Sequence, residues 1–248
     1  MRKVIHPDYM NCAEELAALP RGEYAPLKTF CNNRNKVELV SVGGRPLVVK
    51  TYKQTNLITG LIYTFFRKSK ARRAYEHALE LISRGIKTPF PVAYFEKSRW
   101  SIFRHGYFVS EFTDLPSVSD TFYSDKLTQE EHDRMADSLS RFTLELHNKG
   151  IIPLDYNTTN ILFEKTETGY SFTLIDINRM KIGTVPGVKD AMRSFFQLGT
   201  YPSDYFSLLG PYVHERSLDF EEALYYVIIH RRNQRRLRKF KRFFKPKR

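Results

Sequence analysis

Five polar side chains, far apart in the sequence, are of the types that phosphoryl transfer requires. Asp155 and Asn160 share the short stretch "DYNTTN", Asp176 follows the apolar run "FTLI", Lys50 interrupts the strand-like run "LVVKTY", and Glu76 lies in a helical stretch. In phosphoryl transfer a carboxylate accepts the proton of the attacking hydroxyl, while an amide and a second carboxylate hold magnesium. A lysine fixed by a glutamate grips the nucleotide phosphates. These residues therefore predict catalytic roles for Asp155, Lys50 and Glu76, and magnesium ligands at Asn160 and Asp176.

The spacing of these residues suits that chemistry. Four residues separate Asp155 from Asn160, which is enough for a loop to turn one toward an acceptor hydroxyl and the other toward a metal ion. Two oxygen ligands, completed by phosphates and water, suit octahedral magnesium. Taken singly, Asp155 and Asn160 could be turn formers and Lys50 a surface lysine. Their combination in this order favours the catalytic interpretation.

The elements that must position these residues can be read from periodicity. Alternating or apolar runs predict strands at 24–30, 37–42, 47–52, 88–98, 106–114 and 161–163, with a turn at Gly43 and Gly44, and the stretch 170–183 is expected to be a strand that ends in polar residues. Helical spacing predicts helices over 60–85 (in two pieces, ending at Gly85), 127–150, 187–199 and 220–248. Because the strands come mostly first and the helices mostly later, the chain is expected to be an α+β protein of two lobes.

Two helices have apolar stripes that predict which face is buried. In the earlier helix the stripe is Tyr75, Leu79 and Ile82. In the helix over 127–150 it is Met135, Leu139, Phe142 and Leu146, and Thr128 with Glu131 predicts a capping box at its start. His147 lies on the apolar side of the same helix and is expected to be a packed histidine. The lone Trp100 is expected to pack or to lie on the surface.

These motifs, in this order, resemble the protein-kinase-like superfamily. The matching segments are "LVVK", the helix with Glu76, "SEFTD", "GIIPLDYNTTNIL" and "LIDIN". The segment "FFRKSKARRAYEHALELISRGIKTPFPVAYFE" is similar, more narrowly, to bacterial lipopolysaccharide core kinases, which phosphorylate Kdo or heptose sugars. The resemblance covers roughly residues 25–200. It implies a bilobal kinase-like fold: an N-lobe over 1–112 with an antiparallel sheet and one main helix, and a helical C-lobe over 113–248.

The resemblance also implies roles for single residues. ATP would lie between the lobes, with the Glu111 carbonyl and the Thr113 amide at the adenine edge. Lys50, paired with Glu76, would bind the phosphates, although Glu80 lies one turn on and competes for that pairing. Asp155 would be the base, and Asn160 and Asp176 the magnesium ligands.

The sequence departs from the family pattern at three places. Pro153 stands where such loops usually carry His, and Asn178 replaces the glycine of the metal motif. No glycine-rich loop covers the phosphates; "CNNRNK" stands there, and Arg34 or Lys36 could contribute charge. These departures keep open a catalytically weak or inactive pseudokinase that acts as a binding protein. The missing peptide-substrate segment favours a small or lipid-borne acceptor, with another small molecule or a protein as alternatives.

The net charge of +13 is concentrated in the C-terminal segment. From Arg231 onward the chain has 11 Lys or Arg and no Asp or Glu. Leu237, Phe240, Phe243 and Phe244 recur on one side of the expected helix. This pattern predicts a helix that lies on an anionic membrane surface, where a lipid-linked sugar substrate would be found. A solvated basic helix and nucleic-acid binding are the less favoured alternatives.

The remaining composition fits a cytoplasmic enzyme at the inner face of the membrane. No signal peptide or run of 18 apolar residues is evident. Cys12 and Cys31 have no paired spacing and are expected to be reduced thiols. The leading hypothesis is an ATP- and magnesium-dependent kinase of a lipopolysaccharide inner-core sugar. The acceptor hydroxyl and the oligomeric state stay open.

Overall fold

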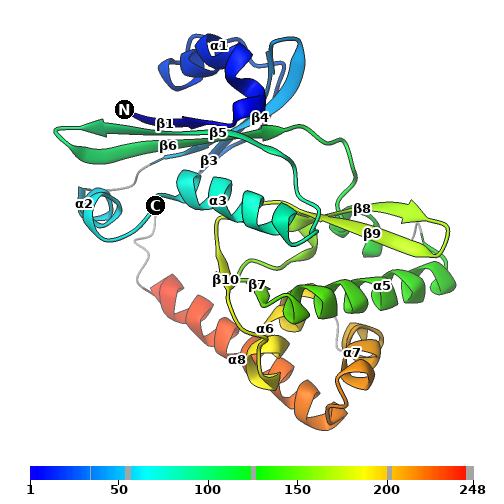
Figure 1. The fold of residues 1–248 in the computed structure, drawn as a ribbon. Helices are drawn as coiled ribbons and strands as arrows, with labels where there is room; N and C mark the ends of the chain where they lie inside the picture. Colours follow the sequence, from blue (N-terminus) through cyan, green and yellow to red (C-terminus); the bar gives the residue numbers. More distant parts are fainter. Residues whose placement is uncertain (34, 54–56, 124–126, 200–202, 244–248) are drawn as a thin grey trace. The chain divides into compact units, whose positions relative to one another are not determined.

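The computed structural model describes residues 1–248 except 34, 54–56, 124–126, 200–202 and 244–248 (Figure 1). The chain forms two compact units. The first unit comprises Met1–Asp114 and Leu174–Arg179, and the second comprises Leu115–Thr173 and Met180–Arg248. The boundary thus lies two residues after the expected position 112, and one short segment from the later half of the chain belongs to the first unit.

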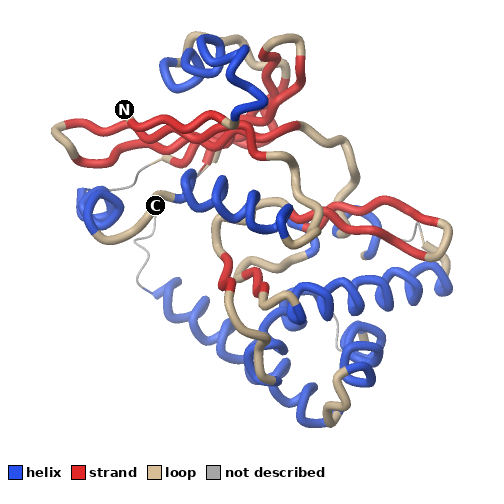
Figure 2. The backbone as a smooth tube through the Cα atoms, in the orientation of Figure 1, coloured by secondary structure: helices blue, strands red, loops and turns tan. Residues whose placement is uncertain are grey.

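The first unit is built on an antiparallel sheet with the strand order β1-β5-β6-β4-β3-β2 (Figure 2). The strands are β1 (Arg2–Ile5), β2 (Lys28–Asn32), β3 (Asn35–Val42), β4 (Arg45–Tyr52), β5 (Pro91–Arg99) and β6 (Ile102–Glu111). The predicted turn at Gly43 and Gly44 is present, with φ values of 56° and 72°. Gly43 is also needed for space, since a Cβ there would come within 2.4 Å of Cys12 Sγ.

Helices cover both faces of this sheet. The short helix α1 (Ala13–Ala18), flanked by the 3-10 turns Pro7–Cys12 and Leu19–Arg21, covers one face, and α3 (Lys70–Ser83) covers the other (Figure 1). Side chains of a strand alternate between faces, so Leu47 and Val49 join the core beneath α1 while Tyr52 packs with α3. Lys50 shares the strand parity of Tyr52 and therefore lies on the α3 face.

The predicted helix over 60–85 is indeed two helices, α2 (Leu57–Phe65) and α3. Ser69 caps α3 by accepting a hydrogen bond from the Arg72 amide, and Gly85 follows its end at φ 72°. The predicted buried stripe is wrong in part. Leu79 and Ile82 are 36% and 38% exposed. The face that packs on the sheet carries mainly small residues: Ala71, Ala74, Tyr75, Ala78 and Leu81.

The second unit is mainly helical. Its helices are α4 (Ser119–Phe122), α5 (Gln129–Asn148), α6 (Val188–Leu198), α7 (Asp204–Glu215) and α8 (Phe220–Phe243). Two small antiparallel pairs complete it: β7 (Ile151–Pro153) with β10 (Met180–Ile182), and β8 (Ile161–Thr166) with β9 (Gly169–Leu174). The 3-10 turn Thr158–Asn160 precedes β8. The order of the elements confirms the α+β class. Sequence periodicity had indicated no helix at α7, which contains Gly210 and Pro211.

Helix α5 confirms its sequence predictions. Thr128 and Glu131 form the capping box, and Met135, Leu139, Phe142 and Leu146 are buried. His147 is fully buried between Tyr212 Oη (2.7 Å) and Ser194 Oγ (3.0 Å), as expected of a packed histidine. Burial, with a smaller effect of Arg216, lowers the His147 pKa to about 3.

Candidate active site

In the first unit, the structure brings together Lys50 and Asp176. Lys50 Nζ lies 2.6 Å from Asp176 Oδ1, and the two side chains are 16% and 30% exposed. Lys50 reaches this position from the middle of β4, where Val37 of β3 and Phe108 of β6 flank it in register. A partly buried lysine and carboxylate at this distance form a charge-assisted contact. This pair is the centre of the candidate site in the first unit.

Asn178 holds the same carboxylate. Its Nδ2 donates to Asp176 Oδ1 over 2.5 Å, and Asn178 is only 6% exposed. Asp176 itself has φ 53°, in the left-handed region that asparagine and aspartate tolerate better than most residues. Where the sequence has Asn178 in place of the family's glycine, the structure therefore shows a side chain that fixes the orientation of Asp176.

The segment Leu174–Arg179 is tied to the rest of the first unit by hydrogen bonds. The Leu174 amide donates to the Lys87 carbonyl (2.9 Å), and Thr88 Oγ1 donates to the Leu174 carbonyl (2.7 Å). His77 Nδ1 lies 2.7 Å from the Ile177 carbonyl. A carbonyl only accepts, so Nδ1 carries the proton. Burial lowers the His77 pKa, although the bond to Ile177 opposes this, so the ring is neutral near pH 7.

The predicted ion pair between Lys50 and Glu76 is wrong. Glu76 instead accepts from Lys68 Nζ and from Arg72 Nε, both over 2.8 Å. Burial raises the Glu76 pKa, but these two hydrogen bonds outweigh it and leave the pKa below its ordinary value. The competing candidate, Glu80, pairs with Arg84 instead. Helix α3 packs on the sheet through its alanines, and this fixes its rotation. His77, and not a glutamate, is the α3 side chain that contacts the segment Leu174–Arg179.

The surroundings of the pair are cationic. The Lys50 and Lys70 ammonium groups lie 5.6 and 5.9 Å from the centre of the buried Tyr52 ring. Burial raises the Tyr52 pKa, with the nearby Asp176 charge adding to this and Arg73 opposing it. Arg73 has a buried Nε without a hydrogen-bond partner, and burial together with the charges of Arg67 and Arg179 lowers its pKa. Several cationic groups near Tyr52, beside the Lys50–Asp176 pair, suit a polyanion such as a triphosphate.

In the second unit, the loop that contains Asp155 and Asn160 is closed by its own hydrogen bonds. The Asp155 carbonyl accepts from the Asn157 amide (3.0 Å) and from Asn160 Nδ2 (3.0 Å). Asn157 Oδ1 accepts from the Thr159 amide (3.1 Å). Because the Asn160 amide nitrogen is used as a donor inside the loop, its oxygen is turned to the other side. The loop thus holds the Asn160 side chain against the Asp155 backbone, while the catalytic role of the Asp155 carboxylate stays a prediction.

The loop is anchored on both sides. Tyr156 is buried beneath it, with its hydroxyl 3.0 Å from Thr143 Oγ1 of α5, and burial raises its pKa. Before the loop, Pro153 pairs in register with Met180 of β10. At the start of β7, Gly150 has φ 68°, and a Cβ there would come 1.9 Å from the Gly183 carbonyl oxygen. Pro153 thus stands in a short strand pair where a family member usually carries histidine.

Each unit carries one of the predicted magnesium ligands. Asp176 of the first unit offers a carboxylate and Asn160 of the second unit an amide oxygen, and each is of the hard oxygen type that magnesium prefers. Within the described part of the chain, no three His, Cys, Asp or Glu side chains gather as a metal site would require. A magnesium ion would therefore need phosphate and water oxygens to complete its coordination, as in phosphoryl-transfer enzymes.

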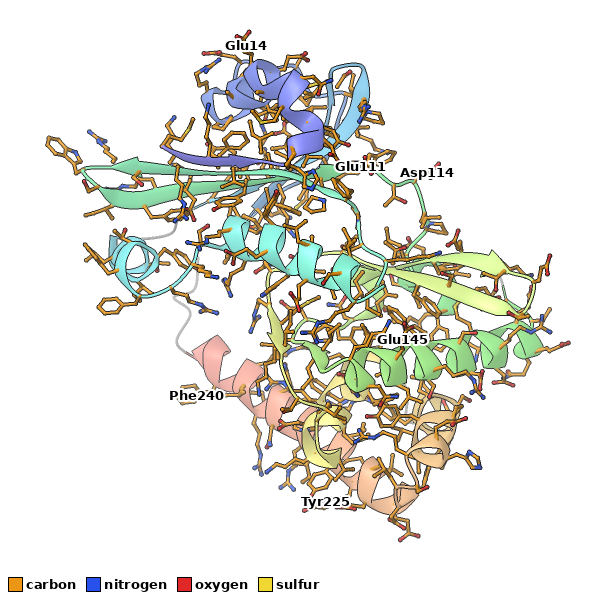
Figure 3. All side chains as sticks on the ribbon, in the orientation of Figure 1. Glu14, Glu111, Asp114, Glu145, Tyr225 and Phe240 are labelled. Carbon is orange, nitrogen blue, oxygen red and sulfur yellow. The ribbon has the colours of Figure 1, made fainter. Side chains whose placement is uncertain are left out.

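The residues predicted for adenine lie at the end of β6. Glu111 pairs in register with Leu47, its amide donates to the Phe90 carbonyl (2.9 Å), and its carboxylate accepts from the Tyr9 hydroxyl. Thr113 follows, just before Asp114 closes the first stretch of the unit (Figure 3). Arg34 lies outside the described residues.

Sequence and structure comparisons identify the family. A sequence model of the lipopolysaccharide kinase (Kdo/WaaP) family matches residues 43–201, well over half of the chain. The chain belongs to the lipopolysaccharide kinase (Kdo/WaaP) family. It is therefore a phosphotransferase, and the resemblance expected from the sequence is confirmed. The matched range of this Kdo/WaaP kinase includes Lys50, Asp155, Asn160 and Asp176.

One solved structure supports the fold of this Kdo/WaaP kinase. "WaaP in complex with acyl carrier protein" aligns with a TM-score of 0.64 at 16% identity, over 96% of this chain and 99% of that one. This likeness confirms the expected fold. The MAP kinase LmaMPK10 from Leishmania major aligns with a TM-score of only 0.40 at 14% identity, over 68% of this chain and 51% of that one. No curated protein sequence matches the chain.

Sequence reasoning missed Lys70 and Arg73 near Tyr52, and it missed the hydrogen bond from Asn178 to Asp176. Asn178 had a detectable signal, since an asparagine two residues after an aspartate is within reach of its carboxylate. Arg73 had none, because its position depends on how α3 is rotated on the sheet. Among the described residues, no helix combines the length and the hydropathy that a membrane span requires.

Proposed function

We propose that the chain transfers the γ-phosphoryl group of ATP to a sugar hydroxyl of the lipopolysaccharide inner core, on Kdo or heptose. The observation that carries the proposal is the 2.6 Å contact between Lys50 Nζ and Asp176 Oδ1. In kinases a strand lysine grips the phosphates, and a carboxylate after a later strand holds their metal ion. The cations near Tyr52 support an anionic ligand at the same place.

The proposed reaction gives a role to each of the predicted residues. Lys50 binds the phosphates, and Asp155 accepts the proton of the sugar hydroxyl as its oxygen attacks the γ-phosphorus. The bond to the β–γ bridging oxygen breaks, and ADP leaves. Asn160 and Asp176 are the residues that would hold magnesium, and the ion, when bound, would supply positive charge that offsets the charge on the transferring group. The Glu111 carbonyl and the Thr113 amide are assigned to the adenine edge.

Asn178 and His77 are proposed as positioning residues for this reaction. Asn178 fixes the carboxylate of Asp176 through one oxygen, and His77 fixes the backbone one residue later. Holding a metal ligand through its neighbours is a common requirement of metal sites. Since Glu76 pairs with Lys68 and Arg72, Asp176 is the only carboxylate assigned to Lys50.

The location of the reaction is proposed to be the inner face of the cytoplasmic membrane, where ATP and a lipid-linked sugar meet. Helix α8 supports this, since Leu237 and Phe240 are 56% and 63% exposed among basic residues (Figure 3). Exposed apolar side chains amid Lys and Arg favour an anionic membrane surface over nucleic acid. Phe243 lies within α8, but its side chain and Phe244 are outside the described residues.

The test is incubation of the full chain with labelled ATP and a lipid A–core extract. We expect label in the lipid fraction, and a loss of several orders of magnitude in Asp155→Asn and in Asp176→Ala, with thermal unfolding largely preserved. Label in a soluble small molecule or a protein would assign a different acceptor. Magnesium-dependent ATP binding without any transfer would instead favour the pseudokinase.

A protein partner is a second proposal. The solved WaaP neighbour is in complex with acyl carrier protein, and the present chain aligns with 99% of that structure. We extend this partner to the present chain. Co-elution of the purified full chain with acyl carrier protein would support it, and separate elution at micromolar concentrations would refute it.

A further inference from the structure

Large aromatic side chains are exposed at one end of the first unit. Phe65, Phe66 and Trp100 are 70%, 85% and 83% exposed. Phe65 ends α2 and Phe66 follows it, while Trp100 forms the turn between β5 and β6 with φ 54°. Scattered exposed apolar residues are ordinary, but three almost fully exposed aromatic rings on two neighbouring elements indicate an interaction surface.

The helix and the hairpin are joined to each other near these rings. The Phe103 amide donates to Thr64 Oγ1 over 3.0 Å, and the rings of Tyr63 and Phe103 lie 5.4 Å apart. Trp100 is three residues from Phe103, at most about 10 Å even along extended chain. Figure 1 shows α2 near the turn end of the β5–β6 hairpin. The rings of Phe65, Phe66 and Trp100, called here the aromatic edge, thus belong to one fixed part of the unit.

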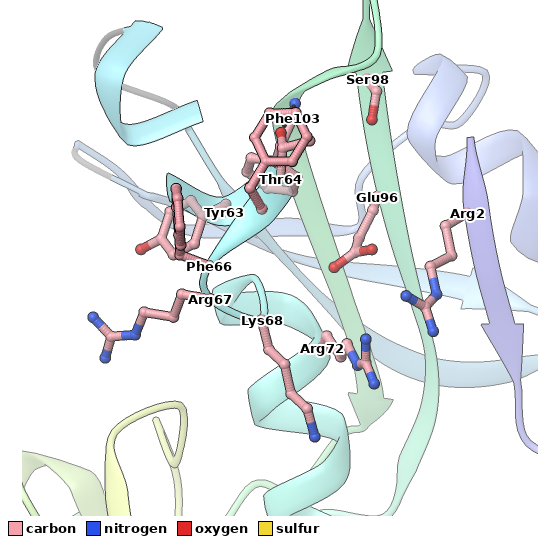
Figure 4. A pocket seen from close by; sticks show the side chains of 11 residues that line it. Arg2, Tyr63, Thr64, Phe66, Arg67, Lys68, Arg72, Glu96, Ser98 and Phe103 are labelled. Atoms are coloured by element: carbon pink, nitrogen blue, oxygen red, sulfur yellow. Dashed lines mark hydrogen bonds between the residues drawn. The ribbon is translucent and has the colours of Figure 1, made fainter. Parts of the chain in front are cut away.

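A cavity of about 460 Å³ opens beside the aromatic edge (Figure 4). Its cationic lining comprises Arg2 of β1 and Arg67, Lys68 and Arg72 around the start of α3, and Glu96 of β5 is its acidic lining residue. Figure 4 shows Arg2 and Arg72 near Glu96, while Arg67 points away from them. Phe65 and Phe66 line the same cavity. A cavity with a mainly cationic charged lining therefore adjoins the exposed rings of Phe65 and Phe66.

The cavity keeps a net positive charge after its internal pairs are counted. Lys68 and Arg72 share the single carboxylate of Glu76, which lies outside the lining. With Glu96 also counted, the four cationic residues of the lining, including Arg67 at its margin, stand against two carboxylates. Two positive charges are left for an outside ligand. A phosphate is the natural anion for an arginine and lysine cluster of this kind.

This combination suits a membrane interface better than another macromolecule. Aromatic rings prefer the headgroup level of a bilayer, and basic side chains keep their charge at the phosphates while their stems lie on apolar surface. A helix end and a hairpin turn can enter the interface without leaving the sheet. Nucleic acid would also bind cations and rings, but α2 adds exposed aliphatic residues, Leu61 and Ile62, that stack poorly on bases.

We propose that the aromatic edge docks the first unit on an anionic phospholipid bilayer, with a lipid phosphate held in the adjoining cavity. This surface is separate in the chain from the basic helix α8, and the kinase reaction is not needed for it to bind. It would give the enzyme a second membrane contact, carried by the nucleotide-binding unit itself.

The chain carries its own reporter for this proposal, because Trp100 is its only tryptophan. The full chain is mixed with vesicles of phosphatidylethanolamine and phosphatidylglycerol, and separately with phosphatidylcholine vesicles. We expect the emission of Trp100 to move to shorter wavelength with the anionic vesicles alone, and brominated lipid to quench it. Vesicle binding without any change in Trp100 emission would overturn the proposal, since α8 would then be the contact.

Variants separate the aromatic edge from other surfaces. Phe65→Ser with Phe66→Ser should weaken partitioning to anionic vesicles about tenfold for each ring removed. Arg2→Ala should weaken it several-fold. The matched control is Phe206→Ser, which removes a ring that is 61% exposed on α7 and should change little. Equal loss in the control and in the Phe65 and Phe66 variant would refute the assignment.

Two further measurements exclude other ligands. Leu237→Ser with Phe240→Ser alters α8 and should leave the vesicle-induced shift of Trp100 emission in place. Inorganic phosphate alone, or RNA alone, should not reproduce that shift. If either does, the surface binds a soluble anion or nucleic acid, and the membrane assignment is wrong. None of these measurements uses ATP, so failure here is distinguishable from failure of the proposed kinase reaction.

Discussion

Replacing Asn178 tests whether Asp176 is a metal ligand held in place by its neighbour. Asn178→Ala removes a hydrogen bond of 2.5 Å to a charged oxygen. Hydrogen bonds to charged groups contribute about 1.5–3 kcal/mol, which corresponds to roughly 10- to 150-fold in an equilibrium. Because Lys50 holds the same oxygen at 2.6 Å, we expect the low end of this range. The magnesium concentration at half-maximal transfer should rise about tenfold.

A second substitution separates the lost donor from the lost volume. Asn178→Asp keeps the size of the side chain but places a carboxylate beside Asp176, so it should raise the magnesium requirement more than Asn178→Ala does. The assay is the initial rate of phosphate transfer as magnesium is titrated at saturating ATP. Thermal unfolding without nucleotide is measured in parallel.

A control accounts for the general loss of stability. Thr128→Ala removes the capping box of α5 and should cost about 1 kcal/mol without touching the site. It should lower the melting temperature and leave the magnesium requirement unchanged. The reasoning is refuted if Asn178→Ala also leaves that requirement unchanged, or if Asn178→Asp needs less magnesium than Asn178→Ala.

Three further predictions concern stability and membrane binding. His147 has a folded-state pKa of about 3, below its ordinary value, so the stability it confers is present above about pH 6.5 and is lost as the pH falls. When the pH is lowered from 8 to 5, the free energy of unfolding of wild type should fall by about 2 kcal/mol more than that of His147→Gln. Urea unfolding at both pH values measures this, and equal losses of free energy would contradict it. Gly150→Ala should lower the free energy of unfolding by about 3 kcal/mol, because the added Cβ would collide with the Gly183 carbonyl and Gly150 has a positive φ. Gly183→Ala should have only a small effect, because no atom lies within contact distance of its added Cβ. Comparing the urea midpoints of the two variants tests this. Leu237→Ser with Phe240→Ser should weaken binding to anionic vesicles, measured by sedimentation, about tenfold or more without changing ATP hydrolysis. A parallel fall in vesicle binding and ATP hydrolysis would instead show that the helix stabilises the fold.

Most of the sheet and the long helices could be predicted, because their signals are local. The turn at Gly43 and Gly44 and the alternating run that contains Lys50 are readable from a few consecutive residues. The capping box at Thr128 and the buried stripe of α5 are equally local. Helix α7 was missed because Gly210 and Pro211 interrupt the pattern by which a helix is recognised.

The partner of Lys50 could not be predicted, because it depends on the rotation of α3. Leu79 and Ile82 suggested one buried face, but the helix packs through Ala78 and Leu81, one residue earlier. One residue corresponds to a rotation of about 100°. Small side chains allow a helix to approach a sheet closely, yet they count little in a search for large apolar residues. Glu76 is consequently turned away from Lys50.

The loop with Asp155 and Asn160 could be predicted as a unit, since its closing hydrogen bonds span only a few residues. The hydrogen bond from Asn178 to Asp176 could have been suspected on the same ground. Which cations gather near Tyr52 could not, because Lys70 and Arg73 come from α3 and meet β4 only in the folded unit.

The placement of Leu174–Arg179 in the first unit has a consequence for how the protein can be made and divided. The hydrogen bonds that receive this segment join residues 86 and 100 positions apart. During translation, the six strands are synthesised long before Asp176. His77 and Thr88 therefore cannot form their hydrogen bonds to the Ile177 and Leu174 carbonyls until the later segment has been made. A fragment that ends at Asp114 would keep the whole sheet and lack the acidic partner of Lys50. Cutting the gene between the two units would therefore not yield an intact first unit.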